Sequence, residues 1–207
     1  IDTIAPSAFT VGAVVTTGAP VVVGWWNSTN TGVSIEVPFD LDASLVGGTM
    51  QLRATVDGVT YVSVGPVNEI FGGYLGNTIS FPLTAVELEA ISGFSEGDVI
   101  TFTAIITDRA GNPTTGTQSV TALTVDQIAP AVDAGSNKEV NTATLQDAIV
   151  TEAGSGISAY LWNQDSGVGT ITFAPNATSE DTNISASADG TYTLSLTVTD
   201  NAGNTAS

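Results

Sequence analysis

Acidic and amide side chains recur in two short phrases whose composition suits a metal ion. The phrase Thr-Asp-Arg-Ala-Gly-Asn at residues 107–112 returns as Thr-Asp-Asn-Ala-Gly-Asn at residues 199–204. A second pair goes with them, Asp-Thr-Ile-Ala-Pro at residues 2–6 and Asp-Gln-Ile-Ala-Pro at residues 126–130. Ca²⁺ is held by carboxylate, amide and carbonyl oxygens, which such phrases supply. The candidate Ca²⁺ ligands are therefore Asp2, Asp108, Asn112, Asp126, Asp200, Asn201 and Asn204.

The same phrases have a second interpretation as plain turns. Asp and Asn side chains bond to nearby backbone groups, and Gly accepts a positive φ, so Asp-x-Ala-Gly-Asn also suits a tight turn without metal. The metal interpretation predicts modest affinity, roughly 10⁻⁴–10⁻³ M, as in extracellular modules. Bound Ca²⁺ would then make the domain junctions rigid. Both interpretations stay open at the level of sequence.

The elements that must position these residues are predicted to be strands. Residues 49–56 alternate with period two and precede Asp57-Gly58, a pair typical of a tight hairpin turn. One short helix is predicted at 85–91, because Thr84 and Glu87 can form a capping box. The other predicted strands are 11–16, 33–37, 59–64, 100–107, 118–125, 144–151, 157–162, 169–173, 183–187 and 191–199. Short strands separated by Gly, Asn and Asp turns indicate an antiparallel sandwich.

The repeated phrases divide the chain into two units, residues 1–126 and 127–207. We predict an all-β protein of two tandem Ig-like antiparallel β-sandwiches, the first with a short helix in a connection between its sheets. In such a sandwich the chain enters at one pole, and the loop after the penultimate strand returns there. Asp126 should then approach residues 200–204, as Asp2 approaches residues 108–112. We also expect the second unit to lack its last strand, either through truncation or because another copy supplies it.

Composition excludes several classes of function. The chain carries 21 acids against three bases, a net charge of −18, which disfavours nucleic acid and anionic membranes. Without histidine, the usual general base and the Ser-His and Cys-His nucleophile pairs are absent, so we expect no enzyme. There is no cysteine, no apolar run of transmembrane length and no visible signal peptide. Because it opens in mid-phrase, the chain is expected to be part of a longer protein.

Four stretches of the second unit carry a family resemblance. They are Val-Asp-Ala-Gly at 132–135, Ala-Tyr-Leu-Trp at 159–162, Ala-Asp-Gly-Thr-Tyr-Thr-Leu at 188–194 and Val-Thr-Asp-Asn-Ala-Gly-Asn at 198–204. Together they resemble the PKD-type Ig-like domain, although Asn163-Gln164 stands where that family often has a Gly-Asp turn. The first unit resembles the bacterial Ig-like repeats of giant surface proteins, chiefly through its boundary phrases. These resemblances imply spacing, display and adhesion at cell surfaces, sometimes as accessory modules of secreted glycosidases.

Aromatic residues provide both core and surface candidates. Trp162 is expected to be the buried tryptophan between two sheets, and Tyr192 to form a tyrosine corner. Neighbouring residues of a strand point to opposite faces, so only one of Trp25 and Trp26 can belong to the core. The candidate contact surface for a sugar or protein comprises Trp25, Trp26, Phe71 and Tyr74. Packing under a loop is the alternative role for these aromatics.

Three functional hypotheses follow. The first is a structural spacer in a large secreted or cell-surface protein such as an adhesin, a surface layer or an extracellular filament. Its partners would be neighbouring Ig-like repeats or copies of itself. The second is a carbohydrate- or protein-binding module whose partners include surface glycans, and the third is an accessory domain of a secreted glycoside hydrolase. Asn27, Asn176 and Asn183 occupy glycosylation sequons, which matter only in an organism that glycosylates asparagine.

Overall fold

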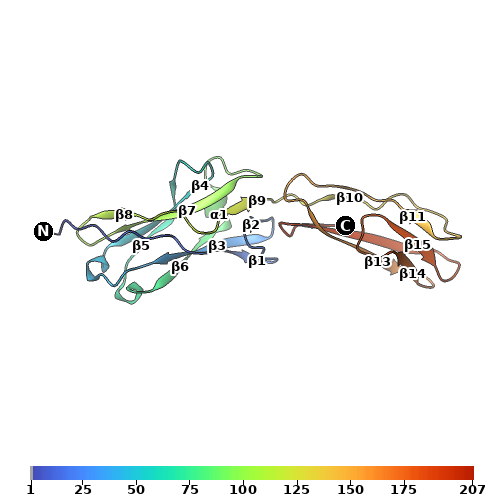
Figure 1. Ribbon diagram of the computed structural model, residues 1–207, viewed down its shortest axis with the longest axis horizontal. Coiled ribbons are helices and arrows are strands. Elements are labelled where there is room, and N and C mark those ends of the chain that lie inside the picture. Colours follow the sequence, from blue (N-terminus) through green and yellow to red (C-terminus); the bar gives the residue numbers. More distant parts are fainter. Residues whose placement is uncertain (1) are drawn as a thin grey trace. The chain divides into compact units, whose positions relative to one another are not determined.

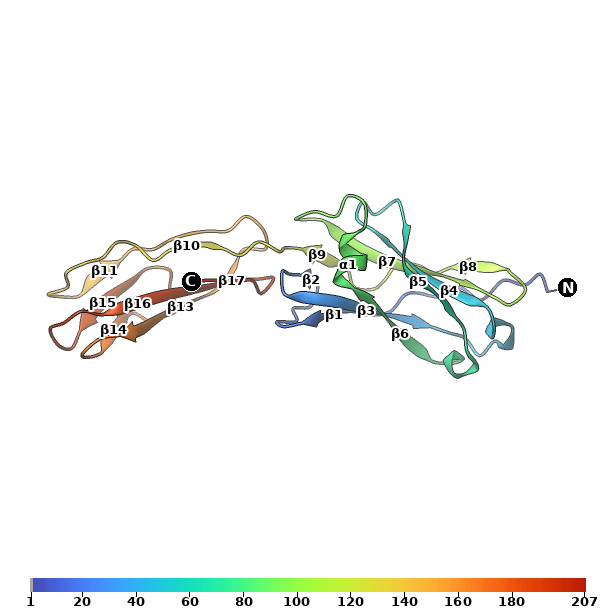
Figure 2. The ribbon, with the colours of Figure 1, turned by 180° about the vertical axis from the view of Figure 1, so that it is seen from behind.

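The computed structural model describes residues 2–207, which fold as two compact units, unit 1 up to residue 126 and unit 2 from residue 127 to 207. Both units are built almost wholly from antiparallel strands, which confirms the all-β prediction (Figures 1 and 2). Among the described residues, no helix has the length and apolar character needed to cross a membrane. Each unit is described below on its own.

One sheet of unit 1 has three strands in the order β1-β3-β6. The strands are β1 (Val14–Gly18), β3 (Asn30–Pro38) and β6 (Thr78–Thr84). Alternation places Val33, Ile35 and Val37 of β3 on one face, and all three are buried. Val33 lies opposite Leu83, and Ile35 lies opposite Phe81, so neighbouring strands present apolar pairs to the same side.

The other sheet of unit 1 has the order β2-β9-β7-β4-β5, with β8 also paired to β7. Its strands are β2 (Trp25–Trp26), β4 (Thr49–Thr55), β5 (Val62–Glu69), β7 (Val99–Thr107), β8 (Pro113–Thr115) and β9 (Leu123–Val125). The predicted hairpin at Asp57-Gly58 is confirmed, because β4 and β5 pair across it. The central strand β7 pairs with β4 over the whole length of β4, with Thr101 to Thr107 opposite Thr55 to Thr49.

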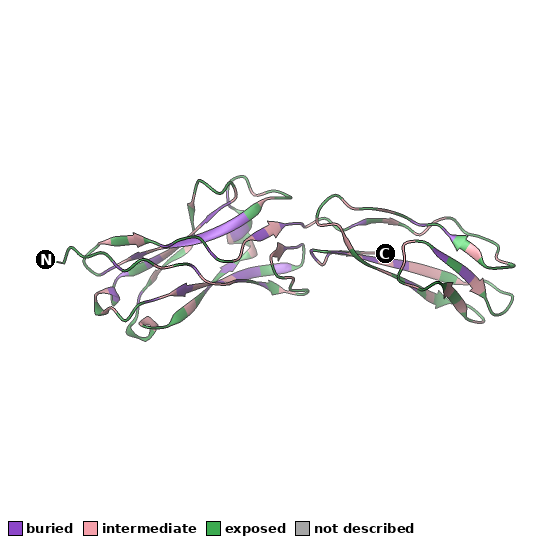
Figure 3. Cartoon of the chain, in the orientation of Figure 1, coloured by how far each residue is buried: buried purple, intermediate pink, exposed green. Residues whose placement is uncertain are grey.

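The core of unit 1 lies between these two sheets. Val33, Ile35 and Phe81 from the first sheet belong to one buried cluster with Leu52 and Phe102 from the second. Figure 3 shows the buried residues gathered along β3, β4 and β7. Unit 1 is therefore a two-layer sandwich with a single hydrophobic core.

The predicted helix forms the connection between the two sheets. Helix α1 (Ala85–Glu89) follows β6 of one sheet and precedes β7 of the other. The capping box is confirmed: the Thr84 side chain accepts from the Glu87 N–H, and the Glu87 carboxylate accepts from the Thr84 N–H at 2.8 Å. The helix ends at Glu89, two residues earlier than predicted. Two 3₁₀ turns complete the unit, η1 (Ala43–Leu45) and η2 (Gly72–Tyr74).

Unit 2 contains three small sheets. Their orders are β13-β16-β17, β11-β15-β14 and β10-β12. The strands are β10 (Ala131–Asp133), β11 (Thr144–Gln146), β12 (Ile149–Thr151), β13 (Ile157–Ser166), β14 (Ile171–Ala174), β15 (Thr182–Ala186), β16 (Thr193–Asp200) and β17 (Thr205–Ala206). β17 pairs with β16 at Thr199↔Thr205, as β8 pairs with β7 at Thr107↔Pro113.

The core of unit 2 is small and centred on Trp162. Its buried members are Ala148, Trp162, Leu196 and Val198. The Trp162 ring stacks on Phe173 with centroids 6.4 Å apart, and its Nε1–H donates to the carbonyls of Ser179 and Glu180 at 3.1 and 3.0 Å. The Tyr192 hydroxyl donates to the Ala188 carbonyl at 2.8 Å, the bond expected of a tyrosine corner. The structural roles predicted for both residues are confirmed.

Several element boundaries differ from the sequence prediction. Residues 144–151, predicted as one strand, form β11 and β12, which belong to different sheets. The chain changes sheet at Asp147-Ala148, where the Ala148 N–H donates to the Asp181 carboxylate at 3.0 Å instead of to a neighbouring strand. Strand β1 begins at Val14, three residues later than predicted, and β9 keeps only the last residues of 118–125. Strands β6, β8, β10 and β17 were not predicted.

Candidate functional site

The Asp-x-Ala-Gly-Asn phrase of unit 1 folds as a closed turn after β7. The Asp108 carboxylate accepts the Asn112 N–H on Oδ1 and the Asn112 side-chain amide on Oδ2, both at 2.8 Å. The Asp108 N–H donates to the Asn112 carbonyl at 3.1 Å, and the Gly111 N–H donates to the Asp108 carbonyl at the same distance. Gly111 has a φ of 96°, which explains the glycine at this position.

The phrase of unit 2 repeats this turn bond for bond. The Asp200 carboxylate accepts the backbone N–H and the side-chain amide of Asn204, both at 2.8 Å, and Gly203 has a φ of 93°. Asp108 and Asp200 are both buried. One function of each aspartate is therefore to close its turn, and its carboxylate oxygens keep further lone pairs that a cation could share. The end of each unit that holds this turn is called its turn pole below.

Residues 2–4 meet the turn at the turn pole of unit 1. The Asn112 Nδ2 donates to the carbonyls of Asp2 and Ile4 at 3.3 and 3.4 Å. The Asp2 carboxylate itself accepts the Ile4 N–H at 3.0 Å. The approach of residue 2 to residues 108–112 thus agrees with the predicted topology, whereas the Asp2 side chain bonds to its own segment.

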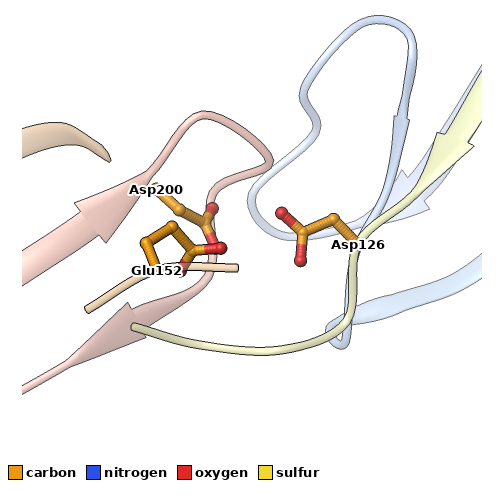
Figure 4. Close-up of side chains that lie close together, drawn as sticks. All are labelled: Asp126, Glu152 and Asp200. Atoms are coloured by element: carbon orange, nitrogen blue, oxygen red, sulfur yellow. The ribbon is translucent and has the colours of Figure 1, made fainter. Parts of the chain in front are cut away.

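An acidic pair lies at the turn pole of unit 2. Glu152 follows β12, and Asp200 ends β16. A carboxylate oxygen of Glu152 lies within 4.8 Å of one of Asp200, and Figure 4 shows the two side chains together. The Glu152 Oε1 accepts the Gly154 N–H at 2.6 Å, whereas its Oε2 is buried with no hydrogen-bond partner in the described structure. The sequence prediction missed Glu152, because it belongs to neither repeated phrase.

Unit 1 carries an acid at the equivalent position. The residue after the turn aspartate donates its N–H to a loop carbonyl in both units: Arg109 to Ser44 at 3.0 Å, and Asn201 to Gly156 at 2.8 Å. Counting back four residues from Ser44 and Gly156 gives Asp40 and Glu152. Asp40 is exposed and lines a depression together with Asp42, Pro6 and Ile106. This equivalence rests on backbone hydrogen bonds between residues far apart in the chain, so no sequence pattern identifies Glu152.

The remaining predicted ligands lie in different settings. Asp126 is the last residue of unit 1 and is labelled in Figure 4; it is buried, and its N–H donates to the Trp26 carbonyl at 2.9 Å. The Asn201 Nδ2 donates to the Ser155 carbonyl at 2.8 Å. The Asn201 side-chain amide thus fixes the loop that follows Glu152.

The adjacent tryptophans separate as expected for neighbouring residues of a strand. Trp26 is 0% exposed, and its Nε1–H donates to the Glu89 carboxylate at 3.1 Å, so the side chain ties β2 to the end of α1. Trp25 is only partly buried. Trp26 is therefore the core member of the pair, and Trp25 is the one available for contact.

The other aromatic candidates lie at the turn pole of unit 1. Tyr74 packs edge-on against the buried Phe81 with centroids 6.0 Å apart, and it also contacts Phe39 at 5.4 Å. Phe71 packs edge-on against Tyr74 with centroids 5.8 Å apart and keeps 55% of its surface exposed. Tyr74 is thus a supporting residue, and Phe71 is the exposed one.

The two aromatic groups do not form one surface. Ile70, beside Phe71, bonds to Gly48 where β4 begins opposite Thr107. Trp25 instead pairs with Thr124, which lies opposite Val99 at the other end of β7. The nine residues of β7 therefore separate the groups by about 26 Å.

Acid is expected to weaken the turn of unit 1. Hydrogen bonds from Asn112 hold the pKa of the Asp108 carboxyl below its ordinary value, against the opposing effect of burial. Because this pKa is lower in the folded than in the unfolded chain, its contribution to stability is complete above the unfolded pKa. That contribution is lost as the pH falls through the folded pKa. The Asp108→Ala variant should lower the unfolding midpoint of unit 1 at neutral pH and reduce its acid dependence, as measured by circular dichroism.

The exposed Glu69 provides the matched control for this variant. Glu69→Ala removes one negative charge from unit 1 without touching the turn, so it should leave the acid dependence close to that of the unaltered chain. Identical acid titrations for Asp108→Ala and Glu69→Ala would contradict a stabilising role for the Asp108 carboxylate.

Comparison with known families bears on the second unit. Residues 134–207 match the family model described as "K319L-like, PKD domain". A search of curated proteins found no match to this sequence. The matched segment begins seven residues after unit 2 (residue 134 against 127) and ends with it. The resemblance of unit 2 to PKD-type Ig-like domains is therefore confirmed, and a domain of this kind is a structural or interaction module that is typically non-catalytic.

Proposed function

We propose that this chain is a structural segment of a large secreted or cell-surface protein, in which Ig-like units repeat in tandem. The observation that carries the proposal is the Asp-x-Ala-Gly-Asn turn, which both units build with the same hydrogen bonds and the same strand register. One structural plan used twice in one chain is typical of repeat arrays, whose partners are neighbouring repeats. The charge of −18 favours solubility and disfavours nucleic acid as a partner.

Ca²⁺ bound at the turn pole of unit 2 is part of this proposal. Glu152 and Asp200 bring two carboxylates close together, and like charges at this separation repel. The Glu152 Oε2 is buried without a hydrogen bond, an arrangement that is unfavourable unless a cation or a water satisfies it. The carboxylate oxygens of Glu152 and Asp200 are ligands of the kind that a hard divalent cation prefers. The expected effect of the cation is to stabilise unit 2.

Thermal unfolding with and without Ca²⁺ tests this site. With a dissociation constant of about 10⁻⁴–10⁻³ M, roughly 10 mM Ca²⁺ should stabilise unit 2 by about 1.4–2.7 kcal/mol. The Glu152→Gln variant should lose this shift. In excess chelator it should also melt above the unaltered chain, because the repulsion between Glu152 and Asp200 is removed while Gln can still accept from the Gly154 N–H.

Asp189→Asn is the matched control, because Asp189 is an exposed acid in the loop before β16, far along the strand from Asp200. This variant should keep the full Ca²⁺ shift. Equal melting curves in Ca²⁺ and in chelator for the unaltered chain would refute Ca²⁺ binding, and an equal loss of the shift in both variants would show that general charge is responsible.

A binding module is the second candidate function, and the exposed Phe71 ring favours it. The ring is held on Tyr74 beside Gly72 and Gly73, whose exposed backbone leaves room for a flat ligand such as a sugar. A glycan array probed with the intact chain discriminates the two candidates. The spacer proposal predicts no glycan signal above background; a signal that disappears in Phe71→Ala and persists in Trp25→Ala would favour the binding module.

A further inference from the structure

The three Asn-x-Ser/Thr sequons lie in three different structural settings. A glycan on asparagine is bulky and occupies the surface, so the side-chain Nδ2 that carries it must be accessible. The sequon also requires a hydroxyl two residues later, so that hydroxyl must be able to approach the asparagine amide. These two requirements discriminate between the three sites.

Asn176 lies in the loop between β14 and β15 and meets both requirements. Its side chain is exposed, and its Oδ1 accepts the Thr178 N–H at 2.9 Å and the Thr178 hydroxyl at 3.0 Å. Because Thr178 is exposed as well, the amide and the hydroxyl of this sequon lie together at the surface. The Asn176 Nδ2 donates no hydrogen bond among the described residues, so no bond of this nitrogen has to break before it reacts.

Asn27 forms the same local turn but is not accessible. Its Oδ1 accepts the Thr29 N–H at 3.0 Å and the Thr29 hydroxyl at 2.8 Å. The Asn27 side chain is nevertheless 0% exposed, and its Nδ2 donates to the Pro20 carbonyl at 3.2 Å. A bulky group on this nitrogen has no room in the folded unit.

Asn183 is accessible but lies within a strand. It belongs to β15, the middle strand of its sheet, where Leu145 and Ala174 lie opposite it on the two neighbouring strands. Residues two positions apart in a strand are separated by about 7 Å. The turn that joins Asn176 to Thr178 therefore cannot form at Asn183 unless β15 leaves both of its neighbours.

The loop that carries Asn176 is anchored on its inner side. The Ala177 carbonyl accepts the Trp162 N–H at 2.8 Å. The carbonyls of Ser179 and Glu180 accept the Trp162 Nε1–H at 3.1 and 3.0 Å. These contacts use backbone groups of the loop, so a substituent on the exposed Asn176 side chain leaves them intact.

From this comparison we infer that Asn176 is a site of N-glycosylation and that Asn27 and Asn183 are not modified in the folded chain. The donor is an oligosaccharide linked to a lipid through pyrophosphate. The Asn176 Nδ2 forms a bond to C1 of the first sugar, and the bond from C1 to the phosphate oxygen breaks. The lipid pyrophosphate leaves with the electron pair of that bond, and one Nδ2 proton passes to a base of the transferase. The proposed secreted or cell-surface location brings the chain and this donor together.

Transfer to the folded chain in vitro tests the inference. The intact chain is incubated with a purified single-subunit oligosaccharyltransferase and its lipid-linked oligosaccharide, and peptide mass spectrometry measures the occupancy of each sequon. Asn176 should carry most of the glycan. Asn27 is the matched comparison, because both sequons end in threonine and form the same turn. Synthetic peptides of residues 22–32 and 171–181, which lack the fold, should be modified to similar extents.

Two variants test the role of the hydroxyl. Thr178→Val keeps the branched shape of the side chain and should abolish glycosylation of Asn176, whereas Thr178→Ser should retain it. Both should unfold at nearly the same temperature as the unaltered chain, because Thr178 is exposed. A folded chain that stays unmodified at Asn176, or that carries as much glycan at Asn27, would overturn the inference. The assay uses purified components, so this result is distinct from a failure of the proposed location or of Ca²⁺ binding.

Discussion

Replacement of Trp162 by alanine is expected to remove most of the stability of unit 2 and to leave unit 1 folded. Trp162 is 2% exposed and is the largest member of a buried cluster that otherwise contains only Ala148, Leu196 and Val198 among the described residues. Substitutions of this kind reduce the free energy of unfolding by about 3–5 kcal/mol. For a unit of 81 residues (127–207), the whole free energy of unfolding is about 4–12 kcal/mol.

Amide hydrogen exchange measures this effect strand by strand. In Trp162→Ala, the amides of β13 and β16 should lose most of their protection, while those of β4 and β7 keep theirs. Leu161→Ala is the matched control, because Leu161 is the neighbouring residue of β13 and is 46% exposed. Equal loss of protection in the two variants, or loss that extends to β4 and β7, would contradict an independent core centred on Trp162.

Replacement of Trp26 should have the corresponding effect on unit 1. The Trp26 side chain is fully buried and bonds to Glu89, so Trp26→Ala removes both core packing and the link to α1. We expect a loss of about 3–5 kcal/mol in the free energy of unfolding. Trp25→Ala should cost clearly less, because Trp25 keeps part of its surface in water.

Denaturant unfolding followed by tryptophan fluorescence separates the units. Trp162 is the sole tryptophan of unit 2, so its transition serves as an internal reference that should not move in Trp26→Ala. The contrary outcome is a larger loss for Trp25→Ala than for Trp26→Ala. That result would contradict the assignment of Trp26, and not Trp25, to the core of unit 1.

Local sequence signals predicted the elements that depend on local chemistry. The turn at Asp57-Gly58, the capping box of Thr84 and Glu87, and the period-two pattern of β4 all depend on residues within a few positions of one another. Trp162 was identified through its resemblance to a family pattern and is buried as expected. Signals of this range are contained within a single element, so they can be recognised without knowledge of the fold.

The missed strands depend on contacts that are distant in sequence. Strand β6 contains Pro82, which argues against a central strand because proline has no N–H to donate. In the structure β6 is the edge of its sheet, with β3 as its one neighbour, and the position of Pro82 is compatible with an edge. The alternation of Ile79, Phe81 and Leu83 was the signal that supported a strand. Whether the segment can be a strand despite Pro82 depends on whether it lies at the edge of its sheet. That position is set by the order of the strands and not by the segment itself.

The candidate site was predicted in part for a similar reason. The aspartates at 108 and 200 stand in repeated phrases, and their turns follow from local chemistry. Glu152 lies 48 residues before Asp200 and reaches it only because β12 ends at the same pole as β16 (200 − 152 = 48). Its buried, unbonded Oε2 became visible only in three dimensions.

Ca²⁺ binding at the turn pole of unit 2 is the part of the proposed function that a single measurement tests most directly. Equilibrium dialysis with radioactive Ca²⁺ measures it directly on the intact chain. Saturable binding is predicted with a dissociation constant of about 10⁻⁴–10⁻³ M, lost in Glu152→Gln and retained in Asp189→Asn. Binding that is absent from the unaltered chain, or that survives in Glu152→Gln, would contradict the claim.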